Sequence, residues 1–271
     1  MGSYKNRLYP RMTERPLRFR LNPYSPLYYG LALAFLGEGA QEGCTHAIDS
    51  GPYQVPTRHY EGQPATLVYD SHLRRPVLSV VSENRRTIRL AYDVILTYPW
   101  SAAVWAHQHA VDKITGFGGT GGIGRTYVWI TDSSKVYVAG TLGASTFGGP
   151  GSLVNVWLHG AFSVLNGLVS GWINGKYMGT NAHTIGDLPI RYIHGREDAF
   201  STNTGYLADL LAWNNRILTT NEAAALADPG NVDLRVGGVP LILPPRRRSW
   251  PGITITTQDE VITLPTLLAE C

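Results

Sequence analysis

The feature that most constrains this chain is a succession of short apolar or alternating runs between residues 27 and 230. Clusters of glycine, proline, asparagine and aspartate separate these runs, and each run is long enough for one strand and short for a helix. Many short strands with turns between them predict an antiparallel β-sandwich or barrel. The runs are Leu31–Phe35, Thr87–Leu96, Trp100–Trp105, Thr126–Thr131, Lys135–Ala139, Leu153–Phe162, Leu168–Ile173, Ile190–His194 and Leu207–Trp213.

The composition agrees with a β-rich domain. Only 16% of the 271 residues are charged, against roughly 25% in an average globular domain, which argues against a disordered chain and a coiled coil. The 30 glycines, 15 tyrosines and 7 tryptophans suit strands joined by tight turns. One helix is predicted at Thr219–Ala227, where Thr219 or Thr220 can cap the start and residues 228–230, Asp-Pro-Gly, end the helix.

The chain divides by composition into three parts. Residues 1–26 form a basic arm in which six basic residues and one acid give residues 1–20 a formal charge of +5, whereas the whole chain carries +3. Residues 27–230 form the strand-rich domain, and residues 231–271 form a second arm with prolines and arginines. We expect both arms to be extended and to contact partners, because a basic arm suits an acidic protein surface, phosphate or nucleic acid.

The second arm contains an alternating, β-branched stretch at residues 253–256, Ile-Thr-Ile-Thr, which predicts a strand. Two interpretations of this strand stay open: it adds to the sheet of a neighbouring molecule, or it folds back on its own sheet. Trp250, beside Pro251, belongs to no core run. We therefore expect Trp250 to contact a partner.

Neither a membrane span nor a disulfide framework is predicted. The longest apolar stretch, residues 27–37, is far short of the ~20 residues that a spanning helix needs. It is similar to a signal-peptide core, but two X-Pro pairs at 22–23 and 25–26 precede it and no small-x-small cleavage site follows, so we expect a strand. Cys44 and Cys271 supply neither a disulfide framework nor a zinc site. Two interpretations stay open, a single bridge between them or two unrelated thiols, and we expect the thiols.

Several segments resemble laminin G-like jelly-roll domains. Residues 157–176, WLHGAFSVLNGLVSGWINGK, resemble the family's hallmark hairpin, and their Asn174-Gly175 pair predicts a type I′ turn. Residues 205–226, GYLADLLAWNNRILTTNEAAAL, resemble its closing strand, turn and helix and are the most specific match. Residues 192–196, YIHGR, resemble another strand, and residues 22–34, NPYSPLYYGLALA, resemble the opening of laminin G-like proteins common in phages and environmental bacteria.

This resemblance covers residues 22–230 and implies a concanavalin A-like jelly roll, which is two packed antiparallel sheets with one short helix. The sandwich therefore follows from the residues and, separately, from the resemblance. The resemblance assigns the fold signature to Trp157, Asn174, Gly175, Asp209, Trp213, Asn214, Arg216 and Glu222.

No pair of catalytic carboxylates is visible. The β-glucanases of this superfamily need two carboxylates on one strand face, roughly 5 Å apart in retaining enzymes. Glu197-Asp198 and Asp259-Glu260 are adjacent pairs, which point to opposite faces of a strand, and Glu38 and Glu42 lie in a glycine-rich turn. We therefore predict no catalytic residue and no enzyme activity, and a glycan hydrolase is the weakest of three hypotheses.

No metal or cofactor is predicted either. His107 and His109 share one strand face, but only Asp112 lies near enough in sequence to extend the pair, so we expect two solvent-facing or hydrogen-bonded histidines. The glycine-rich residues 116–124 are followed by a strand instead of the helix that a nucleotide-binding loop needs, so they predict a turn.

Calcium and sugar sites are likewise not assigned. The acids available for calcium, Asp132, Asp187 and Asp198, do not cluster in sequence. Six tryptophans lie in strand-like runs, so we expect them to pack the sandwich instead of forming a sugar platform. They are Trp100, Trp105, Trp129, Trp157, Trp172 and Trp213.

The first functional hypothesis is a non-enzymatic structural virion protein, a capsid decoration or minor head protein of a tailed bacteriophage. It lies on the capsid surface, after assembly in the host cytoplasm, and contacts the major capsid protein or sister subunits as a homo-oligomer. Protein contact is expected through the arms, with no membrane and no nucleic acid. The residues proposed for these contacts are Arg11, Arg15, Arg18, Arg20, Arg246, Arg247, Arg248, Trp250, Ile253 and Ile255.

The alternative hypothesis is a carbohydrate-binding, lectin-like module of a tail fibre or surface protein. It predicts a concave, solvent-open groove of aromatic and polar side chains on one sheet, with no part for the arms. The fold does not choose between the two hypotheses, because jelly rolls serve as lectins, enzymes and capsid proteins.

Overall fold

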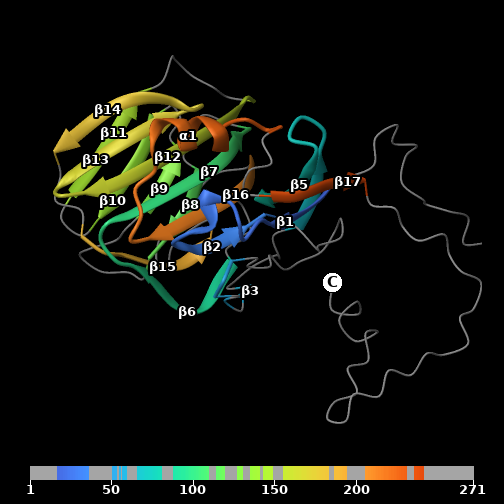
Figure 1. Ribbon diagram of the computed structural model, residues 1–271, viewed down its shortest axis with the longest axis horizontal. Coiled ribbons are helices and arrows are strands. Elements are labelled where there is room, and N and C mark those ends of the chain that lie inside the picture. Colours follow the sequence, from blue (N-terminus) through green and yellow to red (C-terminus); the bar gives the residue numbers. More distant parts are fainter. Residues whose placement is uncertain are drawn as a thin grey trace, which may run out of the picture.

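The computed structural model is an all-β sandwich with one short α-helix among its described residues (Figure 1). Residues 31–35, the first strand expected in the sequence, form β2, and the helix expected at 219–227 is α1. The structure describes residues 17–36, 51–53, 55, 57–59, 66–80, 88–109, 114–119, 127–130, 135–140, 143–148, 155–182, 186–193, 205–230 and 235–240.

Two large antiparallel sheets form the sandwich. The seven-stranded sheet has the order β11 (Gly143–Gly148), β10 (Lys135–Gly140), β9 (Tyr127–Ile130), β8 (Ile114–Gly118), β15 (Leu188–Ile193), β6 (Ile88–Leu96) and β3 (Thr57–His59). The eight-stranded sheet has the order β14 (Lys176–Ala182), β13 (Leu168–Ile173), β12 (Trp157–Leu165), β7 (Trp100–Gln108), β16 (Gly205–Asn214), β5 (Arg75–Val80) and β4 (Thr66–Asp70), with β2 (Leu31–Phe35) also paired to β16. This architecture confirms the predicted antiparallel sandwich.

Every predicted run contains a strand, with shifted ends. β12 begins at Trp157 where the run begins at Leu153, and β7 continues past the run to Gln108. The glycine-rich segment predicted as a turn is partly wrong, because residues 116–118 belong to strand β8. Glycine has no side chain to signal a strand face, so the alternation that marks the other strands is missing there.

The two faces of the eight-stranded sheet bury different clusters. Along β7, alternate residues from Trp100 to Ala106 join the core between the sheets, while Ala103 and Trp105 face outward into other clusters. The outer face is covered by the 3-10 helix η1 (Pro26–Tyr28) and by α1 (Thr220–Leu226), and β2 contributes Leu31 and Ala34 to the same outer cluster. The predicted burial of tryptophans is confirmed for Trp100, Trp105, Trp157, Trp172 and Trp213, but only Trp100 lies between the sheets.

A β-bulge in β16 changes which residues face outward. Ala208 pairs with Trp105 and Leu211 with Ala103, so β16 has one extra residue between the two pairs. Asp209 sits at the bulge with a left-handed φ of 44°. Tyr206 and Ala208 therefore face outward before the bulge, and Leu211 and Trp213 face outward after it.

A buried ion pair holds this bulge. The Nη1 of Arg75 lies 2.5 Å from Oδ2 of Asp209, and both side chains are almost fully buried. The same guanidinium donates from Nε to the carbonyl of Leu73 (3.1 Å) and from Nη2 to the carbonyl of Pro229 (3.4 Å). One side chain thus joins β5, β16 and the segment after α1.

The other signature residues of the closing segment join η1, β2 and α1 to the sheet. The indole of Trp213 donates to the carbonyl of Leu27 (2.7 Å), and Oδ1 of Asn214 accepts from the N–H of Thr97 (2.8 Å). Arg216 donates to the carbonyls of Pro26 and Tyr29 and pairs with Glu222.

The cap of α1 is the first of the two candidates in the sequence. The side chain of Thr219 accepts from the N–H of Glu222, and the Glu222 carboxylate accepts from the N–H of Thr219, which is a complete capping box. Glu222 therefore serves both the helix start and the ion pair with Arg216.

The hairpin turn at 174–175 is the predicted type I′ turn. Asn174 has φ 48° and Gly175 has φ 75°, which are the positive values that this turn requires at both positions. Oδ1 of Asn174 accepts from the N–H of His159 (2.8 Å), so the turn also binds β12.

The two arms meet in a two-stranded ribbon. β1 (Leu17–Leu21) pairs antiparallel with β17 (Arg235–Pro240), and Leu17 is the register partner of Pro240. Arg18 and Arg20 lie in β1. The predicted strand at 253–256 and both cysteines lie outside the described residues. The same holds for the remaining proposed contact residues, which are Arg11, Arg15, Arg246, Arg247, Arg248, Trp250, Ile253 and Ile255. Among the described residues, no helix has the length and apolar character to cross a bilayer.

Two glycines with the same backbone conformation provide a matched test of turn packing. A Cβ at Gly175 would lie 2.8 Å from Cα of Ala224 in α1, whereas a Cβ at Gly167 (φ 72°) would meet nothing within 4 Å. Gly167→Ala is expected to cost about 1–2 kcal/mol for the left-handed backbone alone. Gly175→Ala should cost a further ~1–3 kcal/mol, because the turn and α1 must separate. Urea unfolding measures both, and equal losses would contradict this packing.

The buried ion pair between Arg75 and Asp209 is expected to contribute to the stability of the fold. Arg75→Met leaves the Asp209 carboxylate buried without its partner and is expected to lower the free energy of unfolding by about 3–5 kcal/mol. Arg75→Met with Asp209→Asn should recover part of that loss. The control is Arg191→Met, which breaks the partly exposed 3.4 Å pair with Asp93 and should cost below about 1 kcal/mol. Similar losses for the two arginine variants would refute a structural role for the buried pair.

Candidate functional site

Four rings gather on the outer face of the eight-stranded sheet, at the end of β7. Trp157 of β12 and Tyr206 of β16 are the register partners of His107 in β7, one on each side, and His109 follows just after the strand. We call Trp157, His107, His109 and Tyr206 the histidine–aromatic patch.

The rings of the patch lean over one another. The ring centroids of Trp157 and Tyr206 are 6.3 Å apart with nearly parallel planes (26°), although these residues lie two strands apart, a backbone spacing of about 9.5 Å. His107 lies 5.4 Å from Trp157 and 5.7 Å from Tyr206. His109 stands edge-on to His107 (5.1 Å, 84°) and to Tyr206 (4.7 Å, 86°).

The patch is partly open to solvent. Trp157 is only 7% exposed, whereas His107, His109 and Tyr206 have intermediate exposure. The surface therefore offers one phenol ring and two imidazoles, supported from below by a buried indole. Such a surface has flat apolar faces and hydrogen-bonding edges side by side.

A buried layer beside the patch holds its rings in place. Trp105 packs edge-on against Trp157 (6.4 Å, 79°), and its indole N–H donates to the carbonyl of Leu226 at the end of α1 (3.3 Å). Leu73, Val77 and Ala208 complete the same cluster, to which Tyr206 also belongs. The patch therefore rests on packed secondary structure and not on a free loop.

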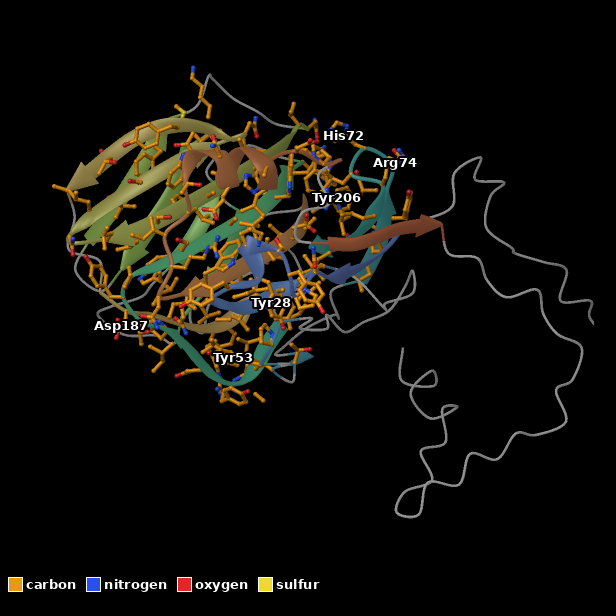
Figure 2. All side chains as sticks on the ribbon, in the orientation of Figure 1. Tyr28, Tyr53, His72, Arg74, Asp187 and Tyr206 are labelled. Carbon is orange, nitrogen blue, oxygen red and sulfur yellow. The ribbon has the colours of Figure 1, made fainter. Side chains whose placement is uncertain are left out.

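The turn between β4 and β5 borders the patch. Oδ1 of Asp70 accepts from the N–H of Leu73 (2.7 Å), and the buried Leu73 fixes the turn against the cluster of Trp105 and Trp157. The flanking His72 and Arg74 are exposed, and Figure 2 shows both at the same end of the molecule as Tyr206. This turn places two basic-type side chains next to the patch.

His107 is the electrostatically perturbed member. Burial lowers its pKa below the usual 6.5, and the neighbouring His109 lowers it further, against smaller opposing effects of Asp70 and of backbone carbonyls at Asn155 and His107. The Nδ1 atom of His107 is buried and has no hydrogen-bond partner in the described part of the structure. His107 is therefore neutral at neutral pH.

Among the described residues, no third metal-binding side chain lies beside His107 and His109. No group of three or more histidine, cysteine, aspartate or glutamate side chains able to hold a metal ion occurs among them, and Asp112 lies outside them. Of the acids considered for calcium, only Asp187 is described; it is exposed, and its Oδ1 accepts from the N–H of Tyr98 (3.0 Å). The carboxylates considered for catalysis all lie outside the described residues.

A second aromatic surface surrounds η1. Tyr24 is 93% exposed and Tyr29 is 75% exposed, although the backbone between them is held by Arg216 and Trp213. Asn22 caps the turn, its Oδ1 accepting from the N–H of Tyr24 (3.0 Å).

Sequence reasoning found part of the patch. It placed His107 and His109 on one strand face, as observed, and it assigned Trp157 to packing. Tyr206 was missed, because simple alternation from Trp213 places residue 206 on the inner face and the bulge at Asp209 reverses this. A left-handed, non-glycine residue inside a strand was the signal, and it is visible only in the backbone.

Comparison with known proteins shows the fold. The sequence matches no protein-family model and no curated protein. Among solved structures, domain 4 of AbnA, a GH43 extracellular arabinanase from Geobacillus stearothermophilus in complex with arabinotriose, is similar with a TM-score of 0.55 and 16% identity, over 73% of this chain and 98% of that one.

Clostridial toxin domains are similar as well. The binding domain of Paraclostridial Mosquitocidal Protein 1 has a TM-score of 0.56 and 10% identity over 74% of this chain and 52% of its own. A botulinum neurotoxin type C structure, whose cell entry depends on two ganglioside molecules, has a TM-score of 0.52 and 12% identity, over 74% of this chain and 51% of its own. This chain thus spans about half the length of the toxin chains. These neighbours are β-sandwich domains, which confirms the fold; the laminin G-like resemblance itself stays a prediction.

Proposed function

We propose that the protein is a non-enzymatic carbohydrate-binding module and that the histidine–aromatic patch is its binding surface. The observation that carries this proposal is the set of half-exposed rings of His107, His109 and Tyr206 on a rigid, packed support. This was the alternative hypothesis from the sequence, and the aromatic and polar side chains of the patch on one sheet support it.

The chemistry of the patch suits a sugar. The apolar C–H face of a pyranose or furanose ring packs against an aromatic ring, and its hydroxyls exchange hydrogen bonds with side chains that both donate and accept. The Tyr206 phenol and the neutral form of an imidazole have this dual capacity. Rings fixed by Trp157 and Trp105 lose little conformational freedom on binding.

The structural neighbours support the same class of function. One is described in complex with arabinotriose, and another is described as depending on gangliosides for cell entry. At 10–16% identity they share the fold with this chain, and the transfer of a glycan ligand is part of our proposal.

Binding by the full chain to a glycan array, followed by calorimetry on the best ligand, tests this function. Tyr206→Ala and His109→Ala are each expected to weaken binding about tenfold, because each removes one ring contact. The control is Tyr92→Ala, which removes an exposed tyrosine from β6 in the other sheet. Equal affinities for the patch variants and the control would overturn the assignment, and no binding to any glycan would overturn the function.

We also propose, as a second candidate, the structural virion role with the arms as contacts to capsid or sister subunits. The supporting observation is the register of Leu17 with Pro240, since both arms leave the described residues at the same point. Two arms that start together can act as one attachment.

Self-association of the full chain tests the arm contacts. Replacing Arg246, Arg247 and Arg248 by serine is expected to shift an assembled species toward monomer in light scattering, because arm contacts would lose three charges. The control is Arg191→Ser in β15, which should leave the assembly unchanged. A full chain that is monomeric and does not co-sediment with phage particles would overturn this candidate.

A further inference from the structure

The proposed stacking of a sugar on the patch does not use the ability of His107 and His109 to carry a positive charge. Their ring centroids lie only 5.1 Å apart, edge-to-face, and one ring nitrogen, Nδ1 of His107, is buried without a hydrogen bond among the described residues. A purely apolar platform would be served better by phenylalanine. The two imidazoles can therefore do more than contact a sugar ring: they can take up protons and bind an anion.

The charged surroundings of the pair are mainly basic. His109 faces His107 from the end of β7, and the exposed His72 and Arg74 flank Leu73 on the neighbouring turn. Asp70 from β4 is the acid that acts on His107, and its Oδ1 already accepts the N–H of Leu73. From β12 and β16 the facing groups are the neutral Trp157 and the Tyr206 phenol.

We propose that the sugar bound at the histidine–aromatic patch carries an anionic substituent, a carboxylate or a sulfate, which the His107–His109 pair binds in its protonated form. This inference rests on the proposed function and names the class of sugar. The sugar ring lies against Tyr206, and the anion accepts charge-assisted hydrogen bonds from the imidazolium N–H groups.

The proposal has a required consequence for protons. Without ligand, burial and the mutual repulsion of the two rings keep the pKa of His107 low, so the pair resists full protonation. An anion removes that resistance and raises the pKa of the pair, so binding takes up protons. Affinity for an acidic sugar therefore rises as the pH falls through the histidine range near ~6.5, and affinity for a neutral sugar does not.

Matched sugar pairs separate the charge from the ring. We would measure binding of the full chain to lactose and sialyllactose, to glucose- and glucuronate-terminated oligosaccharides, and to galactose and its 6-sulfate, at pH 5.5 and pH 8.0. The acidic members should bind about tenfold more tightly at the lower pH, with a change below about twofold for the neutral members. The carboxylate and sulfate arms distinguish the two anions.

Histidine variants and proton counting assign the effect. His109→Gln also removes a ring contact, so its readout is the change of affinity with pH: most of the pH dependence should be lost. The control His72→Gln, on the exposed turn, should leave the pH dependence unchanged. Calorimetry of the unaltered protein in buffers of different ionisation enthalpy should show proton uptake with acidic sugars. This readout does not depend on the folding of any variant.

Each outcome has a distinct meaning. Equal binding of acidic and neutral members at both pH values overturns the anionic ligand and leaves the proposed glycan function intact. Acidic-sugar binding without proton uptake, or with an unchanged pH profile in His109→Gln, overturns the role of the histidine pair. Absence of binding to every sugar overturns the proposed function as well.

Discussion

The buried contact between Arg75 and Asp209 determines much of the rest of the structure. It fixes the bulge in β16, and the bulge decides which side chains reach the outer face at each end of the sheet. At one end Tyr206 joins His107 and His109, and at the other end Trp213 reaches the carbonyl of Leu27. A regular strand would send one of these two aromatic residues into the core. The same guanidinium also binds the β4–β5 turn and the segment after α1, so the borders of the patch depend on it too.

The outer face of the eight-stranded sheet, which carries the proposed binding surface, is only partly covered. The interior between the sheets is filled by aliphatic residues, phenylalanines and Trp100. Outside, η1 and α1 cover the half of the sheet near Trp213, and their positions are set by Arg216, Glu222 and the Thr219 cap. The other half ends in rings that nothing described covers completely. An aromatic surface on such a support is preorganised, which limits the entropy lost on binding.

The sequence predicted the fold well because strand alternation, the Asn174-Gly175 turn and the capped helix are local signals. It assigned the tryptophans to packing correctly but not to the outer face, since period two does not say which face meets the second sheet. The patch could be predicted only as the pair His107 and His109. Its grouping with Tyr206 depends on a cross-strand register and on a bulge whose Asp209 pairs with Arg75, which lies 134 residues earlier in the chain. Partner contacts predicted for the arms depend on residues that the structure does not describe, apart from Arg18 and Arg20 in β1.

The ribbon of β1 and β17 has a mechanical consequence. Leu17 and Pro240 are the outermost pair of an antiparallel ribbon. A force that pulls the two arms apart therefore acts on that pair first and separates the strands one residue pair at a time. Opening in this geometry breaks hydrogen bonds sequentially instead of shearing them together. The ribbon would therefore open at a low force, before the sandwich unfolds.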